Sequence, residues 1–271
     1  MPSPVKANLR RAVLRRRGRS TARPFVHQAA TWVGGLEGRR VLEVGSDQGG
    51  RNLSAVAEMG AEEVVGVNPA MDPAELARNV RLLAEDAGQL PFDDGYFDVV
   101  LTDSVFEHVH DLPGVLDELY RVVKPGGQIL AQYGPIWSTP YGHHLWVHCE
   151  GQLWSYWNVV LPAWCHLVDE PADLHRHCTE RLNLSTDVAN AVVQWVYEDS
   201  GQNRLLFSDY VRIVSECAWT TRWYKGYDYP ELAVRYRSQP DIALRHAEVT
   251  ERWPHCQSWL YDGVMMLLSR G

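Results

Sequence analysis

The sequence predicts an α/β protein built on a doubly wound, mostly parallel seven-stranded sheet with an antiparallel edge strand and an inserted lid. Short β-rich runs alternate with helical runs from residue 39 to about residue 135, and the connections between them are short. Such alternation is typical of a parallel sheet with helices on both faces, which binds ligands beyond the carboxyl ends of its strands. After residue 136 the chain becomes rich in Trp, His and Pro, and we interpret this segment as the lid.

The first half of the chain contains five short apolar runs that are typical of buried strands. A glycine-containing turn at residues 45–50 and a helix at residues 52–59 follow the first run. A second helix, at residues 112–123, is stopped by the turn Lys124-Pro125-Gly126-Gly127, because proline and glycine end helices. The strands are predicted at residues 40–44, 63–67, 80–85, 97–102 and 128–132.

The end of the chain completes the sheet. Residues 208–217 predict a helix, and residues 219–224 and 263–268 predict two further strands that give the antiparallel edge. A second elaboration is expected between Tyr227 and Asp262.

Charge bears on the class of partner. The net charge is −8, and the first 20 residues hold seven basic residues and no acid, which leaves −15 on the rest of the chain. An acidic body disfavours nucleic acid as a partner. The basic segment is interpreted as a solvated tail or the exposed face of a short helix. The helical spacing of Leu9, Val13 and Leu14 would also let it fold over the cofactor cleft, and contact with an anionic acceptor or nucleic acid is a third alternative.

The cellular location is predicted from what the sequence lacks. No run approaches the roughly 18 apolar residues that span a bilayer, and no apolar signal region is found, so we expect a cytoplasmic protein without a membrane partner. Five cysteines without CxxC spacing argue for a reducing compartment.

The turn after the first strand carries glycines as Gly45-x-x-x-Gly49-Gly50, with Asp47 between them. Glycine lets the backbone approach a ligand closely. The spacing differs from the G-x-G-x-x-G of nicotinamide sites, and an acid would repel a pyrophosphate. A cofactor with an amino group and a sulfonium suits Glu43 and Asp47 better.

Three later landmarks give the sequence its resemblance. They are Asp86-Ala87-Gly88-Gln89-Leu90-Pro91-Phe92 with the strand at Phe97-Asp98-Val99-Val100, then Val105-Phe106-Glu107-His108-Val109, then Arg121-Val122-Val123-Lys124-Pro125-Gly126-Gly127. In this order and spacing the chain resembles the class I, Rossmann-like S-adenosylmethionine-dependent methyltransferases, strongly over about residues 38–135. The resemblance implies S-adenosylmethionine as cofactor and S-adenosylhomocysteine as product.

The residue patterns and the resemblance together predict four regions. Residues 1–37 would be the basic N-terminal segment and a leading helix, and residues 38–135 the cofactor-binding core. Residues 136–205 would form the lid or acceptor insertion, and residues 206–271 the completion of the sheet.

Positions of the cofactor contacts follow from the same motifs. Gly45 and its neighbours would hold the methionine portion, Asp86 would accept the adenine amino group, and the Ala87 amide would donate to the ring. Asn68 stands where the family usually has an acid on both ribose hydroxyls, so it would bind them without charge assistance. The complete predicted set is Glu43, Gly45, Ser46, Asp47, Gly49, Asn68, Asp86, Ala87, Asp103 and Ser104.

Candidate catalysts lie just beyond the fifth strand. His143 or His144 could accept a proton from the acceptor, because the pKa of histidine is near 6.5, or both could hydrogen-bond within the lid. Trp137, Tyr141, Trp146 and His108 are predicted to line an aromatic acceptor pocket, with lid core as the alternative. Helix capping and packing are the alternative for Glu107 and His108.

No metal is expected. Histidines and cysteines cluster between residues 143 and 178, which invites a metal hypothesis, but their spacings match no standard zinc pattern.

The function predicted is transfer of a methyl group to an O or N atom of a small molecule, such as a specialised metabolite. The partner would be this small-molecule acceptor, and a homodimer is allowed. Two alternatives stay open, a non-methylating reaction such as cyclisation on the same scaffold and a non-catalytic binding domain.

Overall fold

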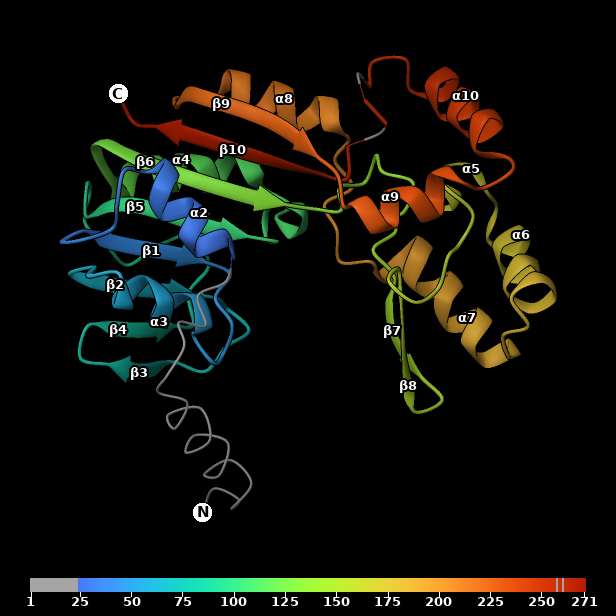
Figure 1. Ribbon diagram of the computed structural model, residues 1–271, viewed down its shortest axis with the longest axis horizontal. Helices are drawn as coiled ribbons and strands as arrows, with labels where there is room; N and C mark the ends of the chain where they lie inside the picture. The colour runs from blue at the N-terminus through green and yellow to red at the C-terminus, as the bar shows by residue number, and fades with distance from the viewer. Residues whose placement is uncertain (1–23, 257, 260) are drawn as a thin grey trace.

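The computed structural model describes residues 24–256, 258–259 and 261–271. The basic segment with Leu9, Val13 and Leu14 lies outside the described residues. One sheet of eight strands dominates the fold, in the order β3-β4-β2-β1-β5-β6-β10-β9 (Figure 1). The strands are β1 (Arg40–Val44), β2 (Glu63–Val67), β3 (Ala74–Ala77), β4 (Val80–Leu83), β5 (Phe97–Asp103), β6 (Val123–Tyr133), β9 (Thr220–Tyr227) and β10 (Gly263–Ser269).

The predicted mostly parallel sheet is confirmed. Strands β4, β2, β1, β5 and β6 pair in parallel, and β10 runs antiparallel to both β6 and β9. The sheet has eight strands rather than seven, because β3 pairs antiparallel with β4 at the far edge. The sequence of β3, Ala-Glu-Leu-Ala, has low β propensity, which explains why this strand was not predicted.

Alternating side chains of the strands bury both faces of the sheet. Leu42 and Val65 pack on one face beneath α4 and α8, whereas Val41 and Val64 pack on the other beneath α2 and α3. This alternation follows from the two-residue period of a strand. The covering helices are α2 (Pro24–Trp32), α3 (Arg51–Glu58), α4 (Leu112–Val122) and α8 (Phe207–Glu216).

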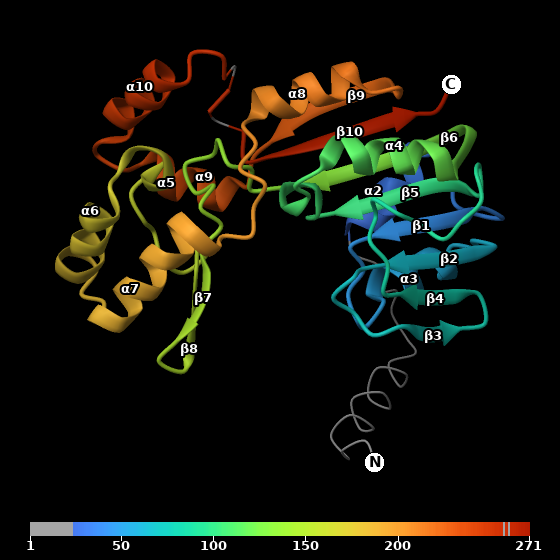
Figure 2. The same cartoon turned by 180° about the vertical axis from the view of Figure 1, so that it is seen from behind.

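A second unit follows the carboxyl end of β6. It contains the hairpin β7 (Trp146–Cys149) and β8 (Gln152–Ser155), the helices α5 (Cys165–Val168), α6 (Pro171–Arg176) and α7 (Thr186–Gln194), and the π-helical turns η2 (His177–Arg181) and η3 (Trp195–Asp199). Figures 1 and 2 show this unit beyond the ends of the parallel strands. The predicted insertion therefore lies at the edge of the sheet where ligands are expected, and we keep the name lid for it.

The lid shares its core with the later elaboration. Helices α9 (Pro230–Arg237) and α10 (Ile242–Arg252) supply Leu232, Tyr236 and Val249 to the cluster that also contains Leu161 and Trp164. Two segments that are separate in the sequence thus fold into one unit. Among the described residues, no helix is both long and apolar enough to cross a membrane.

Candidate functional site

Glu43, at the carboxyl end of β1, orders the glycine turn that follows. Its side chain is buried, and its two oxygens accept hydrogen bonds from the Ser46 hydroxyl (2.6 Å) and the Asn52 amide (2.7 Å). Burial raises the pKa of Glu43, and the negative charges of Asp47 and Asp103 raise it further. Three acidic side chains therefore lie close together at this edge of the sheet, an arrangement that would suit a cationic ligand.

Glycine is required at position 45 by geometry. Gly45 has φ of +82°, and a Cβ atom there would lie 2.1 Å from Cγ2 of Val105, so the glycine turn closely approaches the loop after β5. Asp47 accepts a hydrogen bond from the Gly49 amide (2.9 Å) and pairs with Arg51 (2.9 Å). Its carboxylate is thus shared with α3 and is not a lone counter-charge for a cofactor.

Asn68, just after β2, bridges two loops. Its amide nitrogen donates to the Ser46 carbonyl (3.0 Å), and its amide oxygen accepts from the Ala70 backbone (3.0 Å). Gln48 and Asp72 connect the same two loops by reciprocal hydrogen bonds of 3.0 and 2.8 Å. The sequence analysis missed the Gln48–Asp72 pair, because no local pattern connects a glutamine to a backbone 24 residues away. The ribose contact of Asn68 stays a prediction.

The other predicted cofactor residues follow β4 and β5. Asp86 is exposed and accepts from the Gly88 amide (2.7 Å), and Ala87 is half-buried beside it. Ser104 has φ of 60°, and its amide donates to the Gln132 carbonyl (2.8 Å) while its hydroxyl donates to Asp103 (3.3 Å). Since β4, β2, β1 and β5 are neighbours in the sheet, all ten predicted residues lie along one carboxyl edge.

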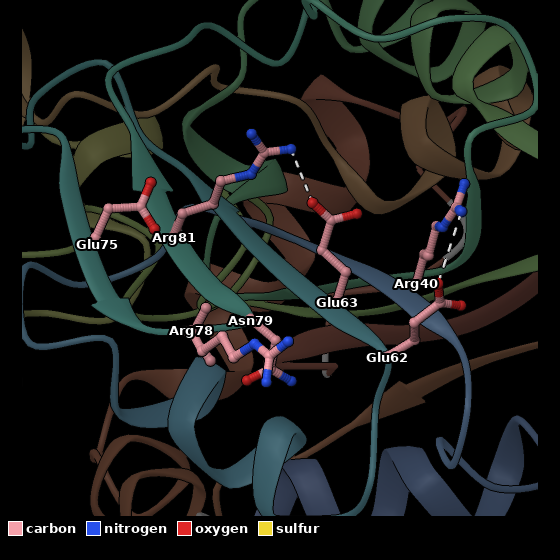
Figure 3. A pocket seen from close by; sticks show the side chains of 8 residues that line it. Arg40, Glu62, Glu63, Glu75, Arg78, Asn79 and Arg81 are labelled. Carbon is pink, nitrogen blue, oxygen red and sulfur yellow. Dashed lines mark hydrogen bonds and ion pairs between the residues drawn. The ribbon is translucent and has the colours of Figure 1, made fainter.

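A cavity of about 370 Å³ lies at the opposite edge, where β1, β2 and β4 begin (Figure 3). Arg81 pairs with Glu63 there at 2.8 Å, and Arg40 approaches Glu62 at 3.7 Å. Its arginines and glutamates largely neutralise one another, and the cavity is remote from the carboxyl edge. We therefore do not assign it to the cofactor.

Glu107 lies in the short turn η1 (Phe106–His108), after β5. It is 1% exposed, and its Oε1 accepts a hydrogen bond from the Gly134 amide (3.0 Å). Its Oε2 is buried without a hydrogen-bond partner among the described residues. Burial raises the pKa of Glu107 to about 8. The predicted packing role fits this position, and the carboxyl group is mainly protonated at neutral pH.

The two predicted catalytic histidines point into different surroundings. His143 is fully buried in the lid core, where Nδ1 accepts from the Leu145 amide (3.1 Å) and the ring packs near His166 and Tyr236. Burial lowers the pKa of His143 far below its usual value. This placement favours the lid-packing alternative for His143, because a base must reach the acceptor.

His144 lies at the junction between lid and sheet. Its ring stacks on His108 with centroids 5.1 Å apart, and burial lowers its pKa to about 3. Tyr156 contacts the His144 ring edge-on, with centroids 5.2 Å apart. His144 and His108 are thus brought together.

The four predicted acceptor-binding residues lie in different surroundings, although Tyr141 is connected to His108 through the rings of Tyr156 and His144. Trp137 and Tyr141 are buried in the lid core, where they pack on His166 (4.5 Å) and Tyr236 (4.7 Å) respectively. Trp146 is 45% exposed on β7, beside a separate cavity of about 220 Å³. Their spacing in the sequence does not reveal which side of the lid each ring faces.

A chain of aromatic rings begins at Tyr156, which contacts His144 and stacks on Tyr141 with centroids 6.0 Å apart. Tyr156 contacts Trp157 (5.3 Å), Trp157 contacts Tyr229 (5.8 Å), and Tyr229 contacts Tyr227 (5.3 Å). This aromatic chain joins the lid to the end of β9. Sequence reasoning missed it, because Trp157 and Tyr229 come from different insertions.

The His- and Cys-rich segment of the lid bears on the metal hypothesis. Within the described part of the chain, no three His, Cys, Asp or Glu side chains converge as metal ligands, and the five cysteines are unpaired.

Comparison with known proteins gives a consistent result. Residues 42–131 match the family model described as a methyltransferase domain. An uncharacterized methyltransferase from Mycobacterium sp. (strain KMS) is 38% identical over 113 residues, which cover 40% of this chain and 43% of that protein. A ubiquinone/menaquinone biosynthesis C-methyltransferase from Idiomarina loihiensis is 28% identical over 162 residues, 55% of this chain and 61% of that protein. The chain therefore matches about half of the length of these relatives.

The fold also matches solved structures. Geranyl diphosphate C-methyltransferase from Streptomyces coelicolor A3(2) superposes with a TM-score of 0.50 at 14% identity, covering 91% of this chain and 78% of that one. At this identity the match supports the fold alone.

Proposed function

We propose, from the premise that the chain belongs to the class I S-adenosylmethionine-dependent methyltransferase family, that it transfers a methyl group to an O or N atom of a small molecule. A specialised metabolite is our proposed kind of acceptor. S-adenosylhomocysteine would be the second product.

The carboxyl edge of the sheet is the observation that carries this proposal. The loops after β1, β2, β4 and β5 gather there, and the acidic side chains of Glu43 and Asp103 lie close together at this edge. S-adenosylmethionine carries an amino group and a sulfonium, so the charge of these loops fits it. Gly45 has no side chain, so the loop after β5 can approach the backbone of the first loop closely through Val105.

The lid supports a small acceptor. It covers the end of the sheet with a core of its own, and His144, Tyr156 and Trp157 bring aromatic surface to the junction. Methyl transfer from a sulfonium needs alignment and exclusion of water more than it needs a strong catalyst. A lid of this kind supplies both.

Transfer of tritium-labelled methyl from S-adenosylmethionine tests the proposal. The purified protein would be assayed against a panel of phenols, alcohols and amines, with carbon acids included because the Idiomarina relative is named as a C-methyltransferase. We expect label in an extractable small product. Binding of S-adenosylmethionine together with unlabelled conversion of a substrate would instead favour a non-methylating enzyme on this scaffold, and absence of any turnover would favour a binding domain.

A further inference from the structure

Hydrogen bonds at the junction of lid and sheet fix which ring nitrogen of His108 carries a proton. Nδ1 of His108 lies 3.0 Å from the backbone carbonyl of Gly201. A carbonyl oxygen only accepts, so Nδ1 must donate. In the neutral ring the lone pair is therefore on Nε2, the nitrogen that can act as a base.

In His144 the other ring nitrogen carries the proton. The amide nitrogen of Gln202 donates to the Pro135 carbonyl (2.8 Å), which fixes the orientation of the glutamine amide. The same nitrogen contacts Nδ1 of His144, so Nδ1 accepts and Nε2 carries the proton. Neutral His144 can therefore donate a hydrogen bond, but it has no free lone pair.

His143 carries its proton on the same ring nitrogen as His144. Its Nδ1 accepts from the Leu145 amide, so its Nε2 carries the proton, and the ring is fully buried. Of these three histidines, His108 alone presents a basic nitrogen. His108 is also in part accessible to solvent.

The position of His108 suits proton transfer. The turn η1 follows β5, whose carboxyl end carries Asp103 and Ser104, so His108 lies at the edge where the acceptor must approach. The Gly201 carbonyl holds one side of the ring and the stacked His144 holds its face. This fixed orientation is what a general base requires.

We propose that His108 is the general base for methyl transfer and that the acceptor is a group that loses a proton, an O–H or an N–H. As the acceptor atom bonds to the methyl carbon, the carbon–sulfur bond breaks and its electron pair stays on sulfur. The acceptor proton moves to Nε2 of His108, and the exposed imidazolium then releases it to solvent. This role of His108 rests on the proposed methyl transfer.

The electrostatics around His108 support this role. Partial burial lowers the pKa of His108 below its usual value, the Gly201 hydrogen bond opposes this shift, and the charge of His110 adds to it. The titratable groups that act on the ring are His110 from its own segment and His144 from the lid. A lowered pKa keeps the ring neutral and Nε2 free near pH 7.

Nitrogen-15 NMR of the imidazoles tests the protonation state without any cofactor. The spectrum of His108, assigned by loss of its signal in His108→Asn, should show the proton on Nδ1, and that of His144 should show it on Nε2. His27→Asn, on the exposed side of α2, is the control for assignment. A proton on Nε2 of His108 would overturn the proposal.

Two variants of His108 separate catalysis from structure. Asparagine can still donate to the Gly201 carbonyl but offers no basic nitrogen, whereas alanine loses both. We expect His108→Asn and His108→Ala each to lower turnover by about 10²- to 10⁴-fold with S-adenosylmethionine affinity unchanged, and added imidazole to restore part of the activity of His108→Ala.

The control and the contrary outcomes are distinct. His27→Ala should keep wild-type turnover. Full activity of His108→Asn, with loss only in His108→Ala and no rescue by imidazole, would show a structural role and overturn the proposal. If wild-type protein transfers no methyl to any panel member, the proposed function fails, whereas the NMR result still decides the state of His108.

Discussion

Gly45 carries the strictest local requirement in the cofactor loops. Its positive φ costs any other residue about 1–2 kcal/mol, and an added Cβ would overlap Val105. Gly126 has a nearly identical φ of +78°, but a Cβ atom added there would meet nothing within 4 Å, so Gly126 isolates the backbone cost.

We expect Gly45→Ala to lose stability beyond that of Gly126→Ala by about 1–3 kcal/mol, the usual cost of overpacking. Its affinity for S-adenosylmethionine should also fall, because the first loop must shift. Urea denaturation and calorimetric titration measure the two effects. Equal losses in the two variants would show that the approach of the loops to each other has no energetic role.

Glu107 makes stability depend on pH. Its folded-state pKa of about 8 lies above the ordinary value of 4.5, so the folded protein holds a proton that the unfolded chain releases. The stabilisation that this bound proton gives to the folded state is complete below pH 4.5 and is lost as pH rises through about 8. Glu107→Gln keeps the oxygen that accepts from Gly134 and removes the titration.

Wild-type protein should therefore become less stable relative to Glu107→Gln as pH rises between 4.5 and about 8, as measured by urea denaturation across that window. Glu118 provides a control of opposite sign, because its hydrogen bond to Arg121 lowers its pKa. The contribution of Glu118 to the free energy of unfolding therefore changes with pH only below pH 4.5, outside this window. A constant stability difference between wild type and Glu107→Gln would contradict the burial of an ionisable carboxyl.

At the residue scale, the sequence could predict the cofactor loops because each depends on neighbouring residues of one motif. Which ring nitrogen of each histidine carries the proton could not be predicted in this way. His108 depends on Gly201, 93 residues later, and His144 depends on Gln202, 58 residues later. Only folding brings these partners together.

At the scale of secondary-structure elements, Asn68 connects the loops after β1 and β2. An aspartate there could not donate to the Ser46 carbonyl and would face it with a negative charge. We expect Asn68→Asp to weaken S-adenosylmethionine binding by about fivefold to tenfold, which corresponds to roughly 1–1.4 kcal/mol for one lost hydrogen bond.

Asn79→Asp is the matched control for this change. Asn79 also donates its amide to a backbone carbonyl, that of Ala61, at the same distance of 3.0 Å but at the opposite edge of the sheet. It should lose stability without changing cofactor affinity. Tighter binding by Asn68→Asp would instead support direct contact with the ribose hydroxyls.

Helices and strands with strong local patterns were predicted well. The predicted limits of β1 and β2 agree with the structure. Those of α3 differ by one residue at each end, and those of α4 differ by one residue at its carboxyl end. The edge strand β3 was missed, since its alanines and glutamate become a strand only by pairing with β4. Tertiary pairing, rather than propensity, forms this element.

At the scale of the whole molecule, the described residues form a sheet with two hydrophobic cores and a lid with a third. The lid core unites residues from 137–206 with residues from 232–259, and the sheet cores contain the strands that end at the cofactor loops. The sequence predicted two elaborations, but their union depends on contacts such as Tyr236 with Tyr141, which no local pattern encodes.

This division predicts that lid and cofactor loops can be perturbed separately. Tyr236 is fully buried, so Tyr236→Ala should destabilise the lid by about 3–5 kcal/mol, the usual cost of truncating a buried aromatic ring. Hydrogen exchange should increase in the lid while affinity for S-adenosylmethionine is retained.

Val234→Ala, on the same helix, is the control, because Val234 is 70% exposed. It should leave exchange unchanged. Loss of cofactor binding in Tyr236→Ala, with the sheet still protected from exchange, would show that the lid holds the cofactor loops in place.

Calorimetric titration of the wild-type protein with S-adenosylmethionine is the most direct test of the family function, since it requires no knowledge of the acceptor. The cationic cofactor matches the acidic carboxyl edge formed by Glu43 and Asp103. We predict saturable binding to one site per chain. A titration without saturable binding at any accessible concentration would contradict the assignment of this edge to the cofactor and, with it, the proposed methyl transfer.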